Sequence, residues 1–336
     1  MKKGITLKDI ARKLNMSVST VSKSLNNDQA ISTLTRERVR ELADKWNYVA
    51  NESARHFKLN RSFTIGLIIP DLQDHFFVKA INGIEAIAGK ENYNILLAQS
   101  HENTCKEESV VNMMIRNRVD GLIAAITKNT TDMTVFEKCR TVGIPVLYIV
   151  REPLKEHACF VSVNNVEGAF KATRFLIKKG HRRIAYIMGP QTMPISMARL
   201  EGYKQALENS AIAFDSELVQ EVNFTEEETE KAMLALMKLE QPPTGIFTFK
   251  NDITLDAISF LKRKYPERLD KIDFTDFGNL PLFKYLDYKP VASVVEDFYE
   301  VGRQAAVLML QMINENKTSE EVKYSNIKIP CKLITN

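Results

Sequence analysis

The stretch ITLKDIARKLNMSVSTVSKSLNN, residues 5–27, decides the fold of the N-terminal part of the chain. Thr6 followed by Asp9 has the form of a capping box, in which the Thr6 hydroxyl accepts from the Asp9 amide. Apolar residues then recur at helical spacing, at Leu7, Ile10, Ala11 and Leu14. Asn15 and Met16 end this pattern, and Ser17 is suited to cap a second helix. The stretch therefore predicts two short helices separated by a tight turn.

A third helix is expected to follow at once. Val21 and Leu25 lie one turn apart on the inner face of the second helix. The third helix is predicted to begin after Ser32, and its apolar set is Leu34, Val39, Leu42, Ala43 and Trp46. Three short helices joined by tight turns form a small core, which is the helix-turn-helix plan.

The second helix carries an unusual number of small polar residues. Serine and threonine have low helix propensity, and a solvent-facing helix more usually holds Glu, Lys and Arg. Small donors and acceptors with one cation, Lys23, are instead suited to phosphates and base edges. The second helix is therefore predicted to contact DNA.

The charge of the chain is unevenly distributed. Residues 1–61 hold 13 Lys and Arg against 6 Asp and Glu, a net +7, whereas the other 275 residues hold 33 against 36, a net −3. A basic N-terminal part fits a polyanion partner. By itself this charge also fits a solvated basic face, so the DNA prediction depends on the helical pattern as well.

Length and composition are those of a globular protein of two or three domains, with 336 residues, 44% hydrophobic and 26% charged. No signal peptide or membrane span is evident, so we expect a cytoplasmic protein at the nucleoid. The four cysteines, Cys105, Cys139, Cys159 and Cys331, are far apart and are interpreted as free thiols. No metal-ligand spacing or cofactor motif occurs, and we expect neither a metal nor a cofactor.

From Phe63 onward the pattern changes to alternating strands and helices. Short apolar runs predict strands at 64–70, 94–98, 121–125, 145–149, 183–187, 245–249 and 292–295. Helical patterns lie between them, the first at 78–91. This alternation predicts an α/β body with two doubly wound, mostly parallel sheets.

The N-terminal segment resembles the DNA-binding domain of the LacI/GalR family of bacterial transcription regulators. The resemblance rests on the capped first helix, the S-x-x-T-V-S-x-x-L-N pattern and the T-R-x-R-V start of the third helix. It implies that the second helix enters the major groove with Val18, Ser19 and Lys23 facing the bases. It further implies phosphate contacts or caps at Thr6, Ser17, Thr20, Ser22 and Asn26. Lys23 stands where Arg is more common, and a lysine lacks the planar fork of arginine.

The next segment resembles the family's hinge helix, which binds the minor groove in dimers. Tyr48, Asn51, Ala54 and Arg55 match the family pattern, whereas Ala50 and Phe57 replace its Pro and Leu. The resemblance implies DNA contacts at Asn51, Ala54, Arg55 and Phe57. Phe57 is suited to wedge between base steps, and ordinary packing on the body is the alternative. The expected domains are 1–49, the hinge 50–61, and the body 62–336.

The body resembles the family's effector domain, which is shaped like a periplasmic sugar-binding protein. The matching runs are IGLIIPD, GHRRIAYIMGP, R-x-x-G-Y at 199–203, and the strand ending in Asn251-Asp252. The expected lobes are about 62–161 with 296–324, and about 162–291 with 325–336. The resemblance makes the chain an α/β protein of two lobes with a small all-α domain in front.

In such a fold the ligand binds between the lobes, at loops after the carboxyl ends of strands. Loop positions together with the resemblance predict effector contacts at Asp74, Phe76, Phe77, Asn164, Arg199, Asn251, Asp252 and Asp276. Phe76 and Phe77 are suited either to stack on a ring or to pack in the core, and Asp252 either contacts ligand or caps a helix. The family reads G-F/Y-D where this chain reads Asp276-Phe277-Gly278, so the ligand need not be that of better-known relatives.

The resulting prediction is a DNA-binding transcriptional regulator, a repressor controlled by a small ligand for which a carbohydrate is the class implied. A homodimer is expected, with much of its contact near residues 78–118, on a near-palindromic double-stranded DNA operator. One rival is a cytoplasmic carbohydrate-binding receptor without specific DNA binding, and another is a sugar-modifying enzyme. No catalytic motif (G-x-S-x-G, P-loop or HExxH) occurs, so no catalytic residue is predicted.

Overall fold

The computed structural model describes residues 5–48, 61–153, 158–278, 280–315 and 325–336. The chain divides into two compact units, residues 1–62 and residues 63–336. We call them the head and the body.

The head consists of three helices, α1 (Leu7–Leu14), α2 (Val18–Leu25) and α3 (Thr33–Lys45). Its core is formed by Ile10, Ala11, Val21, Val39 and Ala43, with Leu7, Leu14, Met16, Leu25, Leu42, Trp46 and Tyr48 packed around them. The predicted helix-turn-helix arrangement is confirmed. The expectation for Leu34 is wrong, because this side chain is 69% exposed. Leu34 precedes Val39 by five residues, which places it about 140° around the helix from the buried face.

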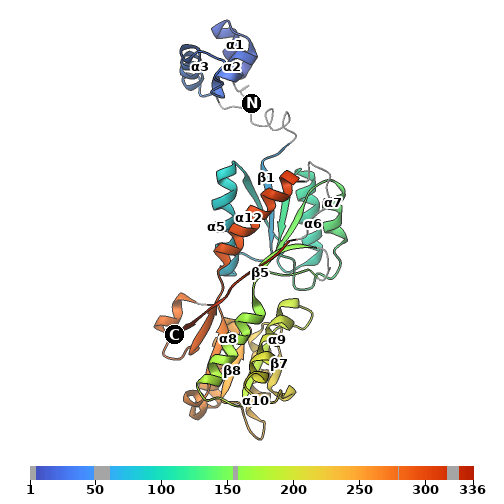
Figure 1. Cartoon of the computed structure of the whole chain (residues 1–336), viewed down its shortest axis with the longest axis vertical. Coiled ribbons are helices and arrows are strands. Elements are labelled where there is room, and N and C mark those ends of the chain that lie inside the picture. Colours follow the sequence, from blue (N-terminus) through green and yellow to red (C-terminus); the bar gives the residue numbers. More distant parts are fainter. Residues whose placement is uncertain (1–4, 49–60, 154–157, 279, 316–324) are drawn as a thin grey trace. The chain divides into compact units, whose positions relative to one another are not determined.

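The first lobe of the body is built on a fully parallel six-stranded sheet. Its order is β11-β5-β4-β3-β1-β2. The strands are β1 (Thr64–Ile69), β2 (Asn94–Gln99), β3 (Gly121–Ala124), β4 (Val146–Ile149), β5 (Cys159–Val163) and β11 (Asn326–Ile329). The helices are α5 (His75–Ala88), α6 (Thr104–Arg116), α7 (Thr134–Thr141) and α12 (Phe298–Glu315). Helices α5 and α12 cover one face of the sheet and α6 and α7 the other (Figure 1).

The second lobe has the same plan with one reversed edge strand. Its sheet order is β12-β10-β9-β8-β6-β7, and only the β10–β12 pair is antiparallel. The strands are β6 (Ile184–Met188), β7 (Val219–Glu221), β8 (Gly245–Thr248), β9 (Asp273–Phe277), β10 (Ala292–Val295) and β12 (Lys332–Thr335). The helices are α8 (Asn165–Lys178), α9 (Pro194–Glu208), α10 (Glu226–Met237) and α11 (Asn251–Lys264). All seven predicted strands are present, and the predicted fold class is confirmed.

Three connections join the lobes: β5 to α8, β10 to α12, and β11 to β12. The third corrects a predicted boundary. Residues 325–336 were expected to lie in the second lobe, but β11 pairs in parallel with β5 of the first lobe, Asn326 opposite Phe160. Only β12 lies in the second lobe, because the chain extends the free edge of β5 before it crosses (Figure 1).

Apolar residues on both faces of the strands form the core of each lobe. Along β1, Ile65, Leu67 and Ile69 pack under α5 and α12, whereas Ile68 packs under α6 and α7. Two glycines permit close helix packing, since a Cβ at Gly302 would overlap the backbone of Ala80 and one at Gly202 that of Val166. The R-x-x-G-Y motif at 199–203 therefore belongs to the α8–α9 contact, and Gly302 belongs to the α5–α12 contact.

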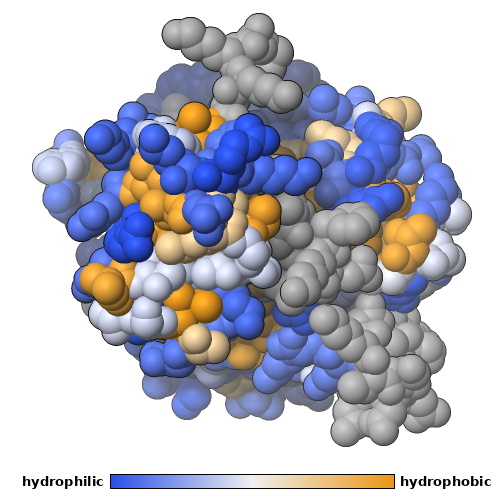
Figure 2. Space-filling model, turned by 90° about the horizontal axis from the view of Figure 1, so that it is seen from above, coloured by the Kyte–Doolittle hydropathy of each residue, from blue (hydrophilic) through white to orange (hydrophobic). Residues whose placement is uncertain are grey.

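The face of the molecule seen in Figure 2 is mainly hydrophilic. Figure 2 shows hydrophobic residues in separate groups within a larger hydrophilic area, as is usual for a folded protein. None of the helices in the described part of the chain is both long and apolar enough to cross a membrane. Within the described ranges there is also no cluster of three His, Cys, Asp or Glu side chains that could hold a metal ion.

Candidate functional site

Helix α2 of the head is held by local side-chain caps. The Ser17 hydroxyl accepts from the Thr20 amide at 3.0 Å, and it lies 2.8 Å from the hydroxyls of both Ser19 and Thr20. At the other end, the Asn26 side-chain amide donates to the Ser22 carbonyl at 2.9 Å. Ser24 is fully buried and donates to the Thr20 carbonyl. These bonds fix a helix whose polar residues have poor intrinsic propensity.

The outward face of α2 presents a small apolar group beside a cation. Val18 is 40% exposed, and the Lys23 side chain is 55% exposed. Lys23 lies 3.8 Å from Asp28, an exposed pair that contributes little free energy. Lys23 therefore remains free to meet a phosphate or a base edge. Thr6 forms the predicted capping box, with its amide donating to the Asp9 carboxylate at 2.9 Å.

The hinge positions predicted to contact DNA, Asn51, Ala54, Arg55 and Phe57, lie outside the described residues.

A cavity of about 580 Å³ lies between the two lobes of the body. The first lobe contributes residues that follow its strands, including Asp74, Phe76, Glu102 and Arg151, and the second lobe contributes Arg199 from α9. Further lining residues come from loops at the carboxyl ends of the strands: Phe224, Phe249, Lys250, Asn251, Asp252, Phe277 and Gly278. A volume of this size and mixed apolar and polar walls are typical of a small-molecule site.

Arg199 makes three hydrogen bonds in the wall of the cavity. It is 3% exposed, and its guanidinium group donates to the Asn165 side chain at 2.9 Å, to the Phe249 carbonyl, and to Glu296 at 2.8 Å. The rings of Phe277 and Phe249 lie 3.5 Å and 4.5 Å from its central carbon. Asn165 follows the first connection between the lobes and Glu296 follows β10 at the second. Arg199 therefore bonds residues at two of the three connections between the lobes.

Asp276 holds the Asn251 side chain by a hydrogen bond. Asp276 has no exposed surface, and its Oδ2 accepts from the Asn251 amide at 2.6 Å and from the Thr254 hydroxyl at 3.0 Å. Burial raises the pKa of Asp276 to about 7, against the effect of hydrogen bonds with Ser293, Asn251 and Thr254. Gly278 has φ +103°, and a Cβ there would overlap the Asn251 side-chain oxygen. The exchange of Asp and Gly in this motif therefore makes room for Asn251.

The first lobe brings a carboxylate and an aromatic ring to the cavity. Asp74 is the N-cap residue of α5 but makes no side-chain cap bond, so its carboxylate is left for other contacts. Burial raises the pKa of Asp74, while Lys250 and Arg151 lower it. The ring of Phe76 lies 4.9 Å from that of Phe298, and both line the cavity.

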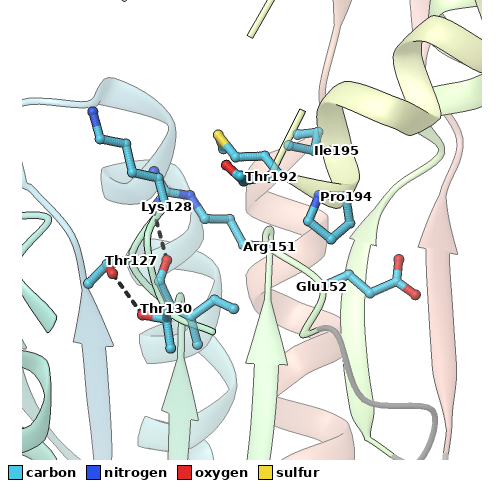
Figure 3. Close-up of a pocket in the computed structure, with 10 residues that line it drawn as sticks. Thr127, Lys128, Thr130, Arg151, Glu152, Thr192, Pro194 and Ile195 are labelled. Carbon is cyan, nitrogen blue, oxygen red and sulfur yellow. Dashed lines mark hydrogen bonds between the residues drawn. The ribbon is translucent and has the colours of Figure 1, made fainter. Parts of the chain in front are cut away.

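A niche of about 20 Å³, the size of a single water molecule, adjoins the cavity. Thr127, Lys128, Thr130 and Arg151 of the first lobe line one side and Thr192, Pro194 and Ile195 of the second lobe the other (Figure 3). Arg151 is held there by Glu102 at 2.6 Å and by the Ile126 carbonyl at 2.8 Å.

Three of the predicted effector contacts require correction. Phe77 is fully buried in the core under α12, because the helical turn that points Phe76 to the cavity points its neighbour inward. Asn164 caps α8 by accepting from the Glu167 amide and does not line the cavity. Asp276 does not line the cavity, and its carboxylate bonds the Asn251 and Thr254 side chains instead. Asp252 lines the cavity and pairs with Lys250 at 2.8 Å.

Sequence reasoning missed Glu296 and the aromatic residues Phe224, Phe249, Phe277 and Phe298. Glu296 directly follows strand β10, so the rule that picked Asn251 after β8 would also have found it. Phe224 has a left-handed backbone, φ +69°, which the sequence does not signal for a phenylalanine.

Sequence comparison relates the whole chain to known regulators. Residues 6–51 match the bacterial regulatory proteins of the lacI family, and residues 65–318 match the periplasmic binding protein domain. The HTH-type transcriptional repressor CytR of Escherichia coli (strain K12) is 32% identical over 330 residues, which cover 98% of this chain and 94% of CytR. The chain belongs to the LacI family.

Further members agree with this assignment. Catabolite control protein A of Priestia megaterium is 28% identical over 330 residues, covering 98% of this chain and 97% of that protein. As a LacI-family protein, the chain is a DNA-binding regulator of transcription with a periplasmic-binding-protein-like effector domain. The matching relatives are transcription regulators rather than enzymes.

Solved structures share the fold of this LacI-family chain. A lac repressor dimer bound to operator and an anti-inducer has a TM-score of 0.82 at 20% identity, covering 99% of this chain and 98% of that one. The regulator CelR in complex with cellobiose has a TM-score of 0.72 at 24% identity, covering 98% of both chains.

Proposed function

We propose that this chain is a repressor that binds a near-palindromic operator as a homodimer and responds to a small molecule in the cavity between its lobes. The observation that carries the DNA half of the proposal is the outward face of α2. Its caps are satisfied within the head, and Val18, Ser19 and Lys23 are exposed. Small side chains next to one cation fit base edges and phosphates in the major groove.

The cavity supports the effector half of the proposal. It combines aromatic rings with a buried arginine and an asparagine, a combination suited to a sugar ring and its hydroxyl groups. CelR is known with cellobiose, and a LacI-family regulator from Enterococcus faecium with ribose. A ligand that binds one arrangement of the lobes more tightly shifts the equilibrium to that arrangement and thereby changes operator affinity.

The dimer is proposed from the operator complex of the lac repressor, in which the protein is a dimer. A two-fold protein favours two symmetric half-sites. The first lobe, near residues 78–118, is proposed to supply much of the dimer contact. A regulator of this kind acts in the cytoplasm, where it reaches the chromosome.

The experiment that tests the DNA half is selection of binding sites from random duplex DNA, followed by affinity measurements at two salt concentrations. Lys23→Gln is expected to weaken the selected site by about 5- to 150-fold and to relax preference at one position of each half-site. Lys45→Gln removes the same charge from the exposed end of α3 and is the matched control. It should weaken all sequences by only about threefold, through a salt-dependent loss. Phe57→Ala tests the proposed minor-groove wedge at the centre of the site.

An enriched palindrome whose base preference is relaxed by Lys23→Gln would support the operator proposal. Sequence-blind binding by the unmodified protein would contradict it, and no DNA binding at all would favour the carbohydrate receptor. The selected site then serves to screen neutral sugars for changes in operator binding. If none of them changes it, the effector half fails while the DNA half stands.

A further inference from the structure

The charge of the cavity's buried arginine is already neutralised. Arg199 and Glu296 are joined at 2.8 Å, and their side chains are 4% and 9% exposed. Burial raises the pKa of Glu296, but the adjacent guanidinium group opposes that rise and favours the carboxylate. We propose that Glu296 determines specificity by excluding anionic ligands, so that the effector is an uncharged polyhydroxylated compound rather than its phosphorylated or carboxylated form. This inference rests on the proposed effector function of the cavity.

The other charges around the cavity are also largely compensated. Arg151 pairs with Glu102 at 2.6 Å, and Lys250 pairs with Asp252 at 2.8 Å. The lining contains five cations and four carboxylates, a net charge of +1: Lys79, Lys128, Arg151, Arg199 and Lys250 against Asp74, Glu102, Asp252 and Glu296. A site for a phosphate dianion needs cations that are not already paired. Arg199 is already paired with Glu296, and the charge of Lys79 also acts on Glu296.

The arrangement suits hydroxyl groups. A guanidinium group has five N–H donors, and three of its nitrogens are engaged here, which leaves two N–H groups for a ligand. Glu296 bonds Arg199 through one carboxylate oxygen, which leaves its other oxygen as an acceptor. A hydroxyl both donates and accepts, so two adjacent hydroxyls can bond both the Arg199 N–H groups and the Glu296 oxygen. A carboxylate or phosphate would instead be repelled by the negative charge of Glu296. The rings of Phe277 and Phe249 offer apolar contact to the carbon face of such a compound.

Inorganic phosphate is the probe that tests this inference without knowledge of the effector. Thermal unfolding of the full chain is measured in phosphate and in chloride of equal ionic strength, for the unmodified protein and for Glu296→Gln. Asp74→Asn is the matched control, because it removes one carboxylate from the same cavity and leaves the Arg199–Glu296 and Lys250–Asp252 pairs intact. Comparison among variants in the same buffer cancels the general stabilising effect of phosphate.

Glu296→Gln is expected to gain about 2–6 °C in midpoint from phosphate relative to the unmodified protein and to Asp74→Asn. That gain should vanish in Glu296→Gln combined with Arg199→Met. A response of the unmodified protein that depends on Arg199 would overturn the inference, since the paired arginine would then accept an anion. No gain in Glu296→Gln would overturn it too, because Glu296 would then be only a structural partner.

If Glu296→Gln does not fold, the unmodified protein and Arg199→Lys decide the matter. Equal responses to phosphate support the inference, and a larger response of the unmodified protein contradicts it. The phosphate readout requires no operator, so its failure is distinct from failure of the proposed effector function. The proposed effector function fails if no small molecule changes operator binding.

Discussion

Asp276 is expected to make the stability of the body fall as pH rises toward neutrality. Its side chain has no exposed surface. Burial raises the pKa of this carboxyl from 3.8 to about 7. Between these values the folded protein binds a proton that the unfolded chain has lost. The free energy of unfolding therefore decreases with rising pH across this window.

The size of the effect follows from the same values. A rise in pKa from 3.8 to about 7 corresponds to about 4 kcal/mol, of which about 2 kcal/mol is lost between pH 5 and pH 7 and about 3 kcal/mol between pH 5 and pH 8. Asp276→Asn replaces the protonated carboxyl by an uncharged group of the same shape. Its amide oxygen still accepts from Asn251 and Thr254. The variant should therefore lack this part of the pH dependence.

The assay is urea unfolding of the full chain and of Asp276→Asn, followed by far-UV circular dichroism from pH 5 to pH 8. The difference between the two proteins cancels every other titrating group. We expect the variant to gain stability relative to the parent as pH rises, by about 3 kcal/mol in total. A difference that stays constant with pH would refute the argument that the buried carboxyl is protonated near neutrality.

Three further predictions concern the glycine at the cavity and the core and caps of the head. Gly278→Ala is expected to destabilise the body by about 1–3 kcal/mol and to weaken effector binding, because the left-handed backbone is strained and Asn251 must move. Gly180→Ala has the same φ of +103° but open space around its Cβ, so denaturation should show only the backbone penalty; equal losses would count against the overlap with Asn251. Ile10→Ala removes a fully buried side chain and should cost the head about 2–5 kcal/mol. Trp46, the single tryptophan, reports this by fluorescence, and an unchanged midpoint of its transition would contradict the packing. Ser17→Ala should destabilise α2 by about 1 kcal/mol in the same assay, whereas no loss would mean that the cap adds nothing.

Much of the head was predictable because its determinants are local. The caps at Thr6 and Ser17 join residues three apart, and the buried positions of α1 follow one helical face. Leu34 was misplaced because apolar character alone does not fix the face of a helix. The strands of the body were predictable from their apolar runs, but the short edge strands β7 and β12 contain no fully buried residue and give a weak signal.

The effector site was only partly predictable. The rule for strand ends identified Asp74, Asn251 and Asp252, and the resemblance added Arg199. Neither indicates which of two adjacent aromatics turns inward, so Phe77 was assigned to the cavity although it is in the core. Neither the rule nor the resemblance indicates that an acidic side chain will bond another residue of the site instead of the ligand, as Asp276 bonds Asn251.

The sequence by itself determined the helix-turn-helix head, the α/β body and the family, because caps, periodicity and apolar runs act over a few neighbouring residues. The tertiary structure decided the partners of Arg199, which lie 34, 50 and 97 residues away along the chain. It also decided that the last two strands belong to different sheets. Such contacts depend on how separate elements pack, and the free energy of a buried charge depends on every group packed around it.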